Sequence, residues 1–400
     1  MEVGGIWAPE PTNPVVYEGL TTNIPKYCMQ TPELDFPQEM TSYVSAAELG
    51  EYIRSYCDAF KLRDRIRFGT TVTKVSPQCS EEEEAKGKSS WSVSWQASAT
   101  SAASAVEESS SFDAVVVATG HYEVPFTPAI AGQEEWLAAA DGAERRIVHS
   151  VTYNKPSEHA GKSVLVVGSR SSGMDIAREL KETARCVYVL DKGCQKVHQE
   201  ANCIQLPRDA KLQENGMLAL SGEAVQGDPV DTVILATGYE YSFPFLDLQE
   251  IGLRLGETRR SVEPLYMHIM HARRPSLNFI GIPLAVPTPI LLFEGQARFV
   301  ASQLKQLQSS LEQREAWVGK QVEAVTDTPQ ALHVLGDTAW EHMLELVDLS
   351  GLQGDDLEAY MRHFNIIRSI YGDIKTKRPK VPWGDDSYRK CEYTVDWKAG

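Results

Sequence analysis

The residues whose types and spacing are suited to chemistry are concentrated in the segment Ser163–Leu180. It begins with the apolar run Ser-Val-Leu-Val-Val, which predicts a strand, and continues with the small-residue turn Gly168–Gly173. The residues that follow have the spacing of an amphipathic helix. A glycine-containing turn between a strand and a helix lets backbone N–H groups and the helix dipole face a phosphate. The segment therefore predicts a site for the pyrophosphate of a dinucleotide.

Two similar segments lie on either side of this turn. Val115–Glu123 reads Val-Val-Val-Ala-Thr-Gly-His-Tyr-Glu, and Val233–Tyr241 reads Val-Ile-Leu-Ala-Thr-Gly-Tyr-Glu-Tyr. In both, an apolar strand ends in Thr-Gly, where the chain can turn tightly beside a flat ligand. Two such strands around one phosphate turn indicate a pair of nucleotide-binding units.

The elements that must position these residues follow from hydrophobic periodicity. A helix is predicted over residues 45–61, with Ser45 as its N-cap. Phe112–Gly120 predicts one continuous strand in a sheet that is buried on both faces. The chain from Gly161 to Gly238 reads strand, turn, helix and strands, which is typical of a parallel, doubly wound sheet. Further short strands are predicted at residues 66–68, 71–75, 91–95 and 277–281.

The rest of the chain is predicted to be loop or helix. Residues 1–40 are Pro-rich and loop-like, and residues 80–90 and 97–111 have the composition of disordered hairpin loops. Two apolar stripes at helical spacing are interpreted as parts of the core. They consist of Val300, Ala301, Leu304, Leu307 and Leu311, and of Leu357, Tyr360, Met361, Phe364 and Ile367.

Composition narrows the function classes. The 400 residues carry a formal net charge of −16, which gives no global basic field for nucleic acid or anionic membrane. Seven cysteines at wide spacings, without C-x-x-C, favour a reducing compartment over a disulfide framework or a zinc site. No signal peptide or membrane span is readable, so a cytoplasmic location is expected.

With these residues in view, the sequence resembles the flavin-containing monooxygenases, a family of class B flavoenzymes. The resemblance covers nearly the whole chain and rests on motifs that occur in the family's order. They are Val3–Trp7, Tyr17–Lys26 followed by Asp35-Phe36-Pro37, His149–Tyr153, Ala236–Tyr239 with Phe243–Leu246, and Glu294–Arg298.

The resemblance implies an activity of the N,N-dimethylaniline monooxygenase type. NADPH would reduce FAD, dioxygen would form a C4a-hydroperoxyflavin, and a soft nitrogen or sulfur nucleophile would take the distal oxygen. The partners implied are thus a small amine or sulfide and O2, and a homodimer is compatible with the family. The cofactors would supply the chemistry, and the protein would supply position, electrostatics and dryness.

The resemblance also assigns the site. Asn23 is the catalytic candidate, because the matching family residue hydrogen-bonds near the N5/C4a edge of the flavin, and an amide donates and accepts without titrating. Thr22 and Asn23 would also meet the nicotinamide. No metal site is assigned. Cofactor binding is assigned to Ile6, Trp7, Thr22, Asn23, Gly168, Ser169, Arg170, Ser171, Ser172, Gly173, Met174, Asp175, Lys192, Thr237, Gly238 and Gln296.

The implied fold is α/β, with two Rossmann-like dinucleotide-binding domains and a helical C-terminal region. Residues 1–155 and 262–400 would form a discontinuous FAD-binding-like domain, into which an NAD(P)-binding domain of residues 156–261 is inserted. The family begins with a βαβ unit that carries G-x-G-x-x-G for FAD, and this chain starts at the far end of that unit with Gly4-Gly5-Ile6-Trp7. We therefore expect an N-terminally truncated FAD domain that binds FAD weakly or not at all.

Three readings stay open from the residues. Arg170 replaces the middle glycine of the turn, where its side chain could crowd the pyrophosphate or clasp it. Asp191 after the next strand favours the free ribose of NADH, whereas Lys192 could counter the 2′-phosphate of NADPH. The alternative function is a catalytically impaired paralogue or truncated isoform that retains only nicotinamide-nucleotide binding. A flavin disulfide reductase is disfavoured by the lack of C-x-x-C.

We interpret the histidines singled out by their sequence context as structural residues, and we assign them no role in the predicted reaction. His149 is interpreted as a residue that shapes an interdomain turn. His268 and His271 have an H-x-x-H spacing, but no companion ligand is evident, so both are interpreted as solvated or core residues.

Overall fold

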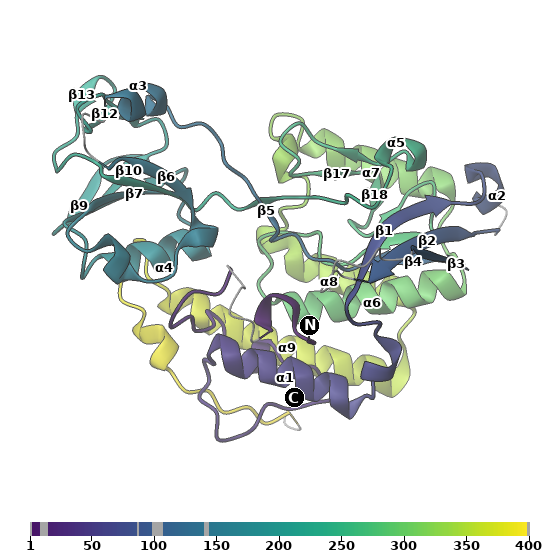
Figure 1. Ribbon diagram of the computed structural model, residues 1–400. Coiled ribbons are helices and arrows are strands. Elements are labelled where there is room, and N and C mark those ends of the chain that lie inside the picture. Colours follow the sequence, from purple (N-terminus) through teal and green to yellow (C-terminus); the bar gives the residue numbers. More distant parts are fainter. Residues whose placement is uncertain (1, 9–14, 86–87, 98–106, 140–143, 398–400) are drawn as a thin grey trace.

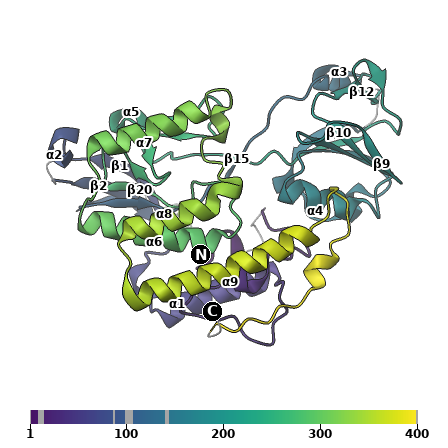
Figure 2. The ribbon, with the colours of Figure 1, turned by 180° about the vertical axis from the view of Figure 1, so that it is seen from behind.

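The protein is described by a computed structural model that covers residues 2–8, 15–85, 88–97, 107–139 and 144–397. In the view of Figure 1, two bodies that contain β-sheets stand above a layer of long helices. We name them the six-stranded body and the four-stranded body, after the main sheet of each. Two connecting segments near β5 and β15 run between them (Figures 1 and 2).

The main sheet of the six-stranded body has the order β6-β14-β7-β8-β10-β9. All neighbours are parallel except β9 and β10, which confirms the predicted parallel sheet. Its strands are β6 (Arg146–His149), β7 (Ser163–Val167), β8 (Cys186–Asp191), β9 (His198–Glu200), β10 (Cys203–Pro207) and β14 (Thr232–Leu235).

Both faces of this sheet are covered. Val164 and Val166 of β7 pack with Ile176 of helix α4 (Ser171–Leu180) in one core, while Leu165 packs with Trp136 in the other. An apolar run without alternation is what a strand buried on both faces requires. The second core lies under helix α3 (Gln133–Ala138) and a small sheet of β11 (Lys211–Leu212), β12 (Leu218–Leu220) and β13 (Glu223–Ala224).

The four-stranded body contains a sheet of order β18-β19-β20-β4 and an antiparallel meander β1-β2-β3. β4 is parallel to β20. These strands are β1 (Thr70–Pro77), β2 (Trp91–Ala97), β3 (Glu108–Phe112), β4 (Val115–Val117), β18 (Leu265–Tyr266), β19 (Met270–His271) and β20 (Leu277–Phe279). Two strand pairs complete the set: β5 (Val124–Pro125) with β15 (Tyr239–Glu240), and β16 (Arg254–Leu255) with β17 (Val262–Glu263).

The other helices lie mostly in the C-terminal part of the chain and confirm the predicted helical C-terminal region. They are α1 (Ala46–Ala59), α5 (Leu248–Ile251), α6 (Pro289–Lys305), α7 (Leu311–Ala324), α8 (Ala339–Ser350) and α9 (Gly354–Lys377). Ser45 caps α1 through a reciprocal capping box with Glu48, as the sequence predicts. Within the described ranges, no helix has the length and apolar character needed to cross a bilayer.

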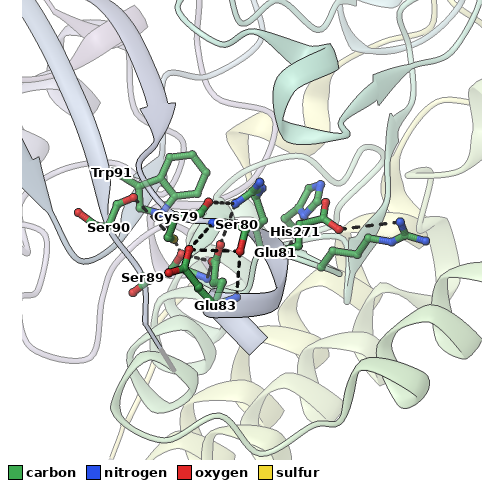
Figure 3. Close-up of polar contacts among 12 residues, drawn as sticks. Cys79, Ser80, Glu81, Glu83, Ser89, Ser90, Trp91 and His271 are labelled. Atoms are coloured by element: carbon green, nitrogen blue, oxygen red, sulfur yellow. Dashed lines mark hydrogen bonds and ion pairs between the residues drawn. The ribbon is translucent and has the colours of Figure 1, made fainter. Parts of the chain in front are cut away.

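The prediction of disordered loops at residues 80–90 and 97–111 is wrong for the parts that the structure describes. Residues 81–85 form helix α2 (Glu81–Ala85), and β3 covers residues 108–112; residues 86–87 and 98–106 lie outside the described residues. Figure 3 shows Cys79, Ser80 and Glu83 at the start of α2, close to Trp91.

Contacts with the four-stranded body explain why α2 forms in an acidic segment. The backbone N–H of Glu83 donates to Ser80 Oγ, 3.2 Å away, and thereby starts the helix. The carboxylate of Glu84 is buried and accepts hydrogen bonds from the Arg274 guanidinium (3.2 Å) and from the backbone N–H of Ser276 (3.2 Å). Because these partners lie 190 residues or more along the chain, local composition could not reveal them.

The expected continuous strand over residues 112–120 is also wrong. β3 ends at Phe112 and β4 begins at Val115. Val116 is 45% exposed while Val117, on the opposite face of the strand, is buried, so one face of β4 is left uncovered. The first apolar stripe is only partly in the core: Val300 is buried, but Leu304 and Leu307 are more than 40% exposed, and α6 ends at Lys305. No strand forms at residues 66–68, but the stripe on α9 is buried through Tyr360, Phe364 and Ile367.

The six-stranded sheet includes β6, which precedes residue 156, the expected start of the inserted domain. β14 lies between β6 and β7 in this sheet and is parallel to both. The domain limits 1–155 with 262–400, and 156–261, stay a prediction.

Candidate functional site

The turn between β7 and α4 is a tight cradle that only glycine allows at two positions. Gly168 has a φ of +110°, and a Cβ there would lie 2.5 Å from the carbonyl oxygen of Ala236. A Cβ on Gly173 would lie 1.9 Å from the carbonyl oxygen of Gly168. The backbone is therefore closely packed on its inner side, while Arg170, Ser171 and Ser172 are exposed on its outer side.

The N-terminus of α4 is free to receive an anion. Arg170 occupies the N-cap position in an extended conformation, and no side chain caps the helix. The first N–H groups of a helix have no partner within the helix, and the helix dipole places positive charge there. The exposed turn and these N–H groups thus fit a pyrophosphate, as the sequence predicts.

The carboxyl ends of the neighbouring strands place Lys192 and Thr237 at the same edge of the sheet. Lys192 follows β8 and is exposed. The carboxylate of Asp191 accepts hydrogen bonds from the backbone N–H of Gly193 (2.8 Å) and from Gln205 Nε2 (2.6 Å), so both of its oxygens have protein partners. One of these partners belongs to the loop after β8 and the other to β10, so the protein fixes the orientation of the carboxylate.

Thr237 and Gly238, which follow β14, join this edge to the connecting segments. The Thr237 hydroxyl donates to the carbonyl oxygen of Phe126 (2.5 Å), and the backbone N–H of Phe126 donates to the carbonyl oxygen of Gly238 (2.9 Å). His149 Nε2 is 3.0 Å from that same oxygen, and His149 Nδ1 accepts from the backbone N–H of Val151. Burial lowers the pKa of His149, so the ring is neutral and shapes the turn.

Asn23 lies at the nucleotide turn although 148 residues separate it from Ser171. Its Nδ2 donates to Ser171 Oγ at 3.3 Å, and its backbone carbonyl accepts from the guanidinium of Arg378 at 2.8 Å. Thr22, beside it, is buried and pairs with Val44 through its backbone N–H and its hydroxyl oxygen. The structure thus brings the catalytic candidate and the turn together.

Asp175 is placed in a protein network rather than toward open solvent. Its carboxylate accepts from the Tyr17 hydroxyl (3.0 Å), from Arg178 (2.5 Å) and from Arg389 (2.6 Å). The side chain is only 8% exposed. The expected contact of Asp175 with a cofactor therefore stays a prediction, and the carboxylate itself joins three segments of the chain.

The remaining predicted residues lie in or near the four-stranded body. Ile6 and Trp7 form a short 3₁₀ turn, and Trp7 packs on the core that α1 and α9 share. Gln296 of α6 is fully buried; its Oε1 accepts from the backbone N–H of Gly281 (3.0 Å), and its Nε2 has no partner. Gly281 follows β20, so Gln296 lies at the carboxyl edge of the parallel pair β20 and β4.

These residues fit a flavin ring better than they fit the phosphates of FAD. The unpartnered Nε2 of Gln296 is a donor at the edge where a flat ligand is expected. Among the described residues, however, the turn 168–173 is the one place where a strand leads through paired glycines into a helix. The described part of the chain therefore holds one cradle suited to the phosphates of a dinucleotide.

Sequence reasoning missed the roles of Tyr17, Arg378 and Arg389, which join segments far apart in the chain at Asp175 and Asn23. Each meets its partner across more than 150 residues, so no local pattern marks it. His268 and His271 are both buried, and within the described residues no group of histidine, cysteine and acidic side chains has the arrangement of a metal site.

Comparison with known proteins finds similarity to flavin-containing monooxygenases. Residues 1–209 and 204–328 match the profile of a family described as Flavin-binding monooxygenase-like. "Flavin-containing monooxygenase FMO GS-OX-like 2" of Arabidopsis thaliana is 30% identical over 76% of this chain and 66% of its own length. "Flavin-containing monooxygenase FMO GS-OX1" of the same plant is 31% identical over 72% of this chain and 60% of its own length. The chain thus spans less than two thirds of these relatives.

Solved structures show the same fold. The S-allyl-L-cysteine S-oxygenase from Allium sativum superposes with a TM-score of 0.77 at 23% identity, covering 97% of this chain and 89% of that protein. Tmm from Pelagibacter superposes with a TM-score of 0.68 at 22% identity, covering 91% and 80%. At these identities the likeness describes the fold.

Proposed function

The chain belongs to the flavin-binding monooxygenase-like family, and from this premise we propose that it binds NADPH and FAD and oxygenates a soft nucleophile. The observation that carries the proposal is the Gly168–Gly173 cradle at the uncapped N-terminus of α4. A backbone that packs this closely leaves its N–H groups for a pyrophosphate. The substrate class is a small amine or sulfide, with O2 as the second substrate.

NADPH is favoured over NADH by the residues after β8. Both oxygens of Asp191 accept hydrogen bonds from the protein, so the carboxylate is poorly placed to accept from a ribose hydroxyl. Lys192 is exposed next to it and offers a positive charge for a 2′-phosphate. Lys192 thus offsets the negative charge of Asp191 at the place where the 2′-phosphate of NADPH would bind.

The chain's own residues would orient the nucleotide and protect the reaction from water. Asn23 at the turn offers an amide that donates and accepts without titrating, and Thr22 beside it is buried. Gln296 offers its unpartnered Nε2 at the edge of β20 and β4. Bound FAD, once reduced, supplies the activation of dioxygen, which no side chain of the protein can provide.

The test uses the full chain with added FAD. Because the sequence leads us to expect weak FAD binding, FAD is supplied in excess. We then expect a yellow complex and NADPH oxidation that depends on both O2 and a sulfide or tertiary amine, with incorporation of one oxygen atom into the substrate. Asn23→Ala should lower oxygenation while NADPH binding falls little. A folded protein that stays colourless with excess FAD, or that oxidises no NADPH, would contradict the monooxygenase proposal. Mass measurement in solution tests the predicted homodimer.

A second candidate function is nicotinamide-nucleotide binding without oxygenation. It is supported by the single paired-glycine cradle among the described residues. Under this alternative, calorimetry finds NADPH binding to a protein that takes up no FAD. Because the two functions share the cradle, Gly173→Ala should weaken nucleotide binding under both.

A further inference from the structure

Three arginines converge on the carboxyl edge of the six-stranded sheet. Arg170 follows β7 in the glycine turn, and Arg208 follows β10. Arg260 comes from the other body, from the loop between β16 and β17. Its side chain nevertheless reaches the edge: a Cβ on Gly238 would lie 3.8 Å from Arg260 Nη2. The Arg260 guanidinium also lies over the ring of Phe126, with Cζ 4.9 Å from the ring centroid.

This group of arginines lacks counter-charges. Within the described part of the chain, none of the three forms an ion pair, whereas the adjacent Arg259 pairs with Glu240 at 3.3 Å. Arg260 Nε is buried and has no hydrogen-bond partner. Burial, followed by repulsion from Arg170 and Arg208, lowers the pKa of Arg260. Like charges gathered beside an unsatisfied buried donor are costly unless an anion binds among them.

Strand order indicates which phosphate Arg260 would meet. Gly238 follows β14, and β14 neighbours β7 on the side away from β8. The ribose of the adenosine half is bound after the strand that corresponds to β8. Neighbouring strands are about 4.8 Å apart, so the end of β14 lies roughly 10 Å from that position. The pyrophosphate lies at the end of β7, directly beside Gly238.

We propose that Arg260 binds the pyrophosphate of the nicotinamide dinucleotide from the side opposite the Gly168–Gly173 cradle, with Arg170 beside it. This inference rests on the proposed nucleotide site and adds a residue from outside the fingerprint. Arg260 thereby links the four-stranded body to the bound nucleotide. Arg170 clasps the phosphate instead of crowding it, because the guanidinium is a bidentate donor to phosphate oxygens.

Calorimetric titration of the full chain with NADPH and with NADH tests this assignment. Arg260→Gln should weaken binding of both nucleotides by the same factor, about 10- to 100-fold, because both carry the pyrophosphate. Arg260→Lys, which keeps the charge but loses the fork, should weaken binding less. Arg254→Gln is the matched control, since Arg254 lies on the same hairpin with its side chain 75% exposed and should leave both affinities unchanged.

Other results would overturn the proposal. Weaker binding of NADPH alone would place Arg260 at the 2′-phosphate, and unchanged affinities would make it a structural residue that stacks on Phe126. Arg260→Met keeps an apolar side chain that can still pack on Phe126. A variant with an unchanged melting temperature and weaker nucleotide binding would show that affinity, and not stability, was lost. If the unaltered chain bound neither nucleotide, the proposed function would fail. Titration with inorganic pyrophosphate would then test the anion site separately. Pyrophosphate binding that is weakened by Arg260→Gln would support the anion site, and a lack of pyrophosphate binding would overturn it as well.

Discussion

Asp175 matches a nucleotide-binding pattern in the sequence, yet its carboxylate is occupied by Tyr17, Arg178 and Arg389. Because the carboxylate and the Arg389 guanidinium are each less than 10% exposed, neither is solvated well by water. Such a pair stabilises a fold mainly in the sense that the loss of one partner leaves the other charge buried and unpaired. At the scale of single residues, the side chain next to the cradle thus serves to hold segments together.

Asp175→Asn is expected to lower the free energy of unfolding by about 3–5 kcal/mol, because it leaves Arg389 without a counter-charge in a buried place. Urea unfolding followed by circular dichroism measures this loss. Asp337→Asn is the matched control; its partner Lys375 and the acid itself are largely exposed, so little change is expected. Equal losses for the two variants would show that the buried network contributes nothing special.

Three buried histidines, His268, His333 and His342, are in contact with one another through His268. His268 Nδ1 is 2.9 Å from His333 Nδ1, and the rings of His268 and His342 are 5.4 Å apart. Burial lowers the pKa values of His333 and His342 to about 4. The ordinary value is 6.5, so between these limits the unfolded chain binds protons that the folded protein does not.

Stability should therefore fall as the pH is lowered from 6.5 towards 4, with a slope of up to about 1.4 kcal/mol per pH unit for each histidine. The measurement is urea unfolding at a series of pH values. His342→Leu removes one of these groups, whose Nε2 has no hydrogen-bond partner, and should make the slope shallower. A variant with the slope of the unaltered chain would contradict this account.

At the scale of elements, the strand–turn–helix unit is fixed by two contacts of glycine backbone. Gly173 lies in the first turn of α4, and its Cα faces the carbonyl of Gly168 so closely that no side chain fits. Local propensity would favour alanine in a helix, and the close approach overrides it. Gly173 is therefore both a residue of the helix and a position that the preceding turn requires to be glycine.

Gly173→Ala should destabilise the protein and weaken nucleotide binding together, because the added Cβ would lie 1.9 Å from a carbonyl oxygen and must displace the turn. Gly372→Ala is the control, since Gly372 lies within α9 and a Cβ there meets no atom within 4 Å. That change should be neutral or stabilise by about 0.5–1 kcal/mol. Melting temperatures and NADPH titrations of both variants check the contrast; tight binding by Gly173→Ala would refute the cradle.

At the scale of the whole molecule, a C-terminal segment ties the six-stranded body to the helical layer. We call residues 379–391 the strap; in Figures 1 and 2 it is the yellow chain that runs from the end of α9 to the body that contains α4. Trp383 inserts into the core beneath α4 and is 1% exposed, with Nε1 3.2 Å from Glu200 Oε2. Arg389 then reaches Asp175, and Asp386 pairs with Arg178 at 3.3 Å.

Trp383→Ala should cost about 3–5 kcal/mol of stability through the cavity that it leaves. It should also release the strap, so that trypsin cleaves at the exposed Lys390 faster than in the unaltered chain. Trp397→Ala is a useful comparison, because Trp397 packs on the core of α1 and α9 rather than beneath α4. If cleavage at Lys390 were equally slow in the Trp383 variant, the strap would be held by its ion pairs alone.

The amino-acid sequence alone was enough to predict the parallel sheet, the Gly168–Gly173 turn, the cap of α1 and the family. These features depend on neighbours along the chain: apolar runs, glycines at fixed spacing and a serine three residues before a glutamate. Each could be inferred without knowing which distant segments meet. The short range of the interactions is the physical reason.

The positions of four residues could not be predicted without the folded structure, because their main partners are far away in the sequence or in the other body. These residues are Asn23, Asp175, Glu84 and Arg260. Glu84 anchors a helix in an acidic stretch by pairing with Arg274, and Val116 is exposed because one face of β4 is left uncovered. Charge pairing, burial and strand adjacency are set by how the chain folds in space, and composition averages over them. The cradle depends on residues that are adjacent in the sequence, whereas the residues around it are brought there by the folding of distant segments.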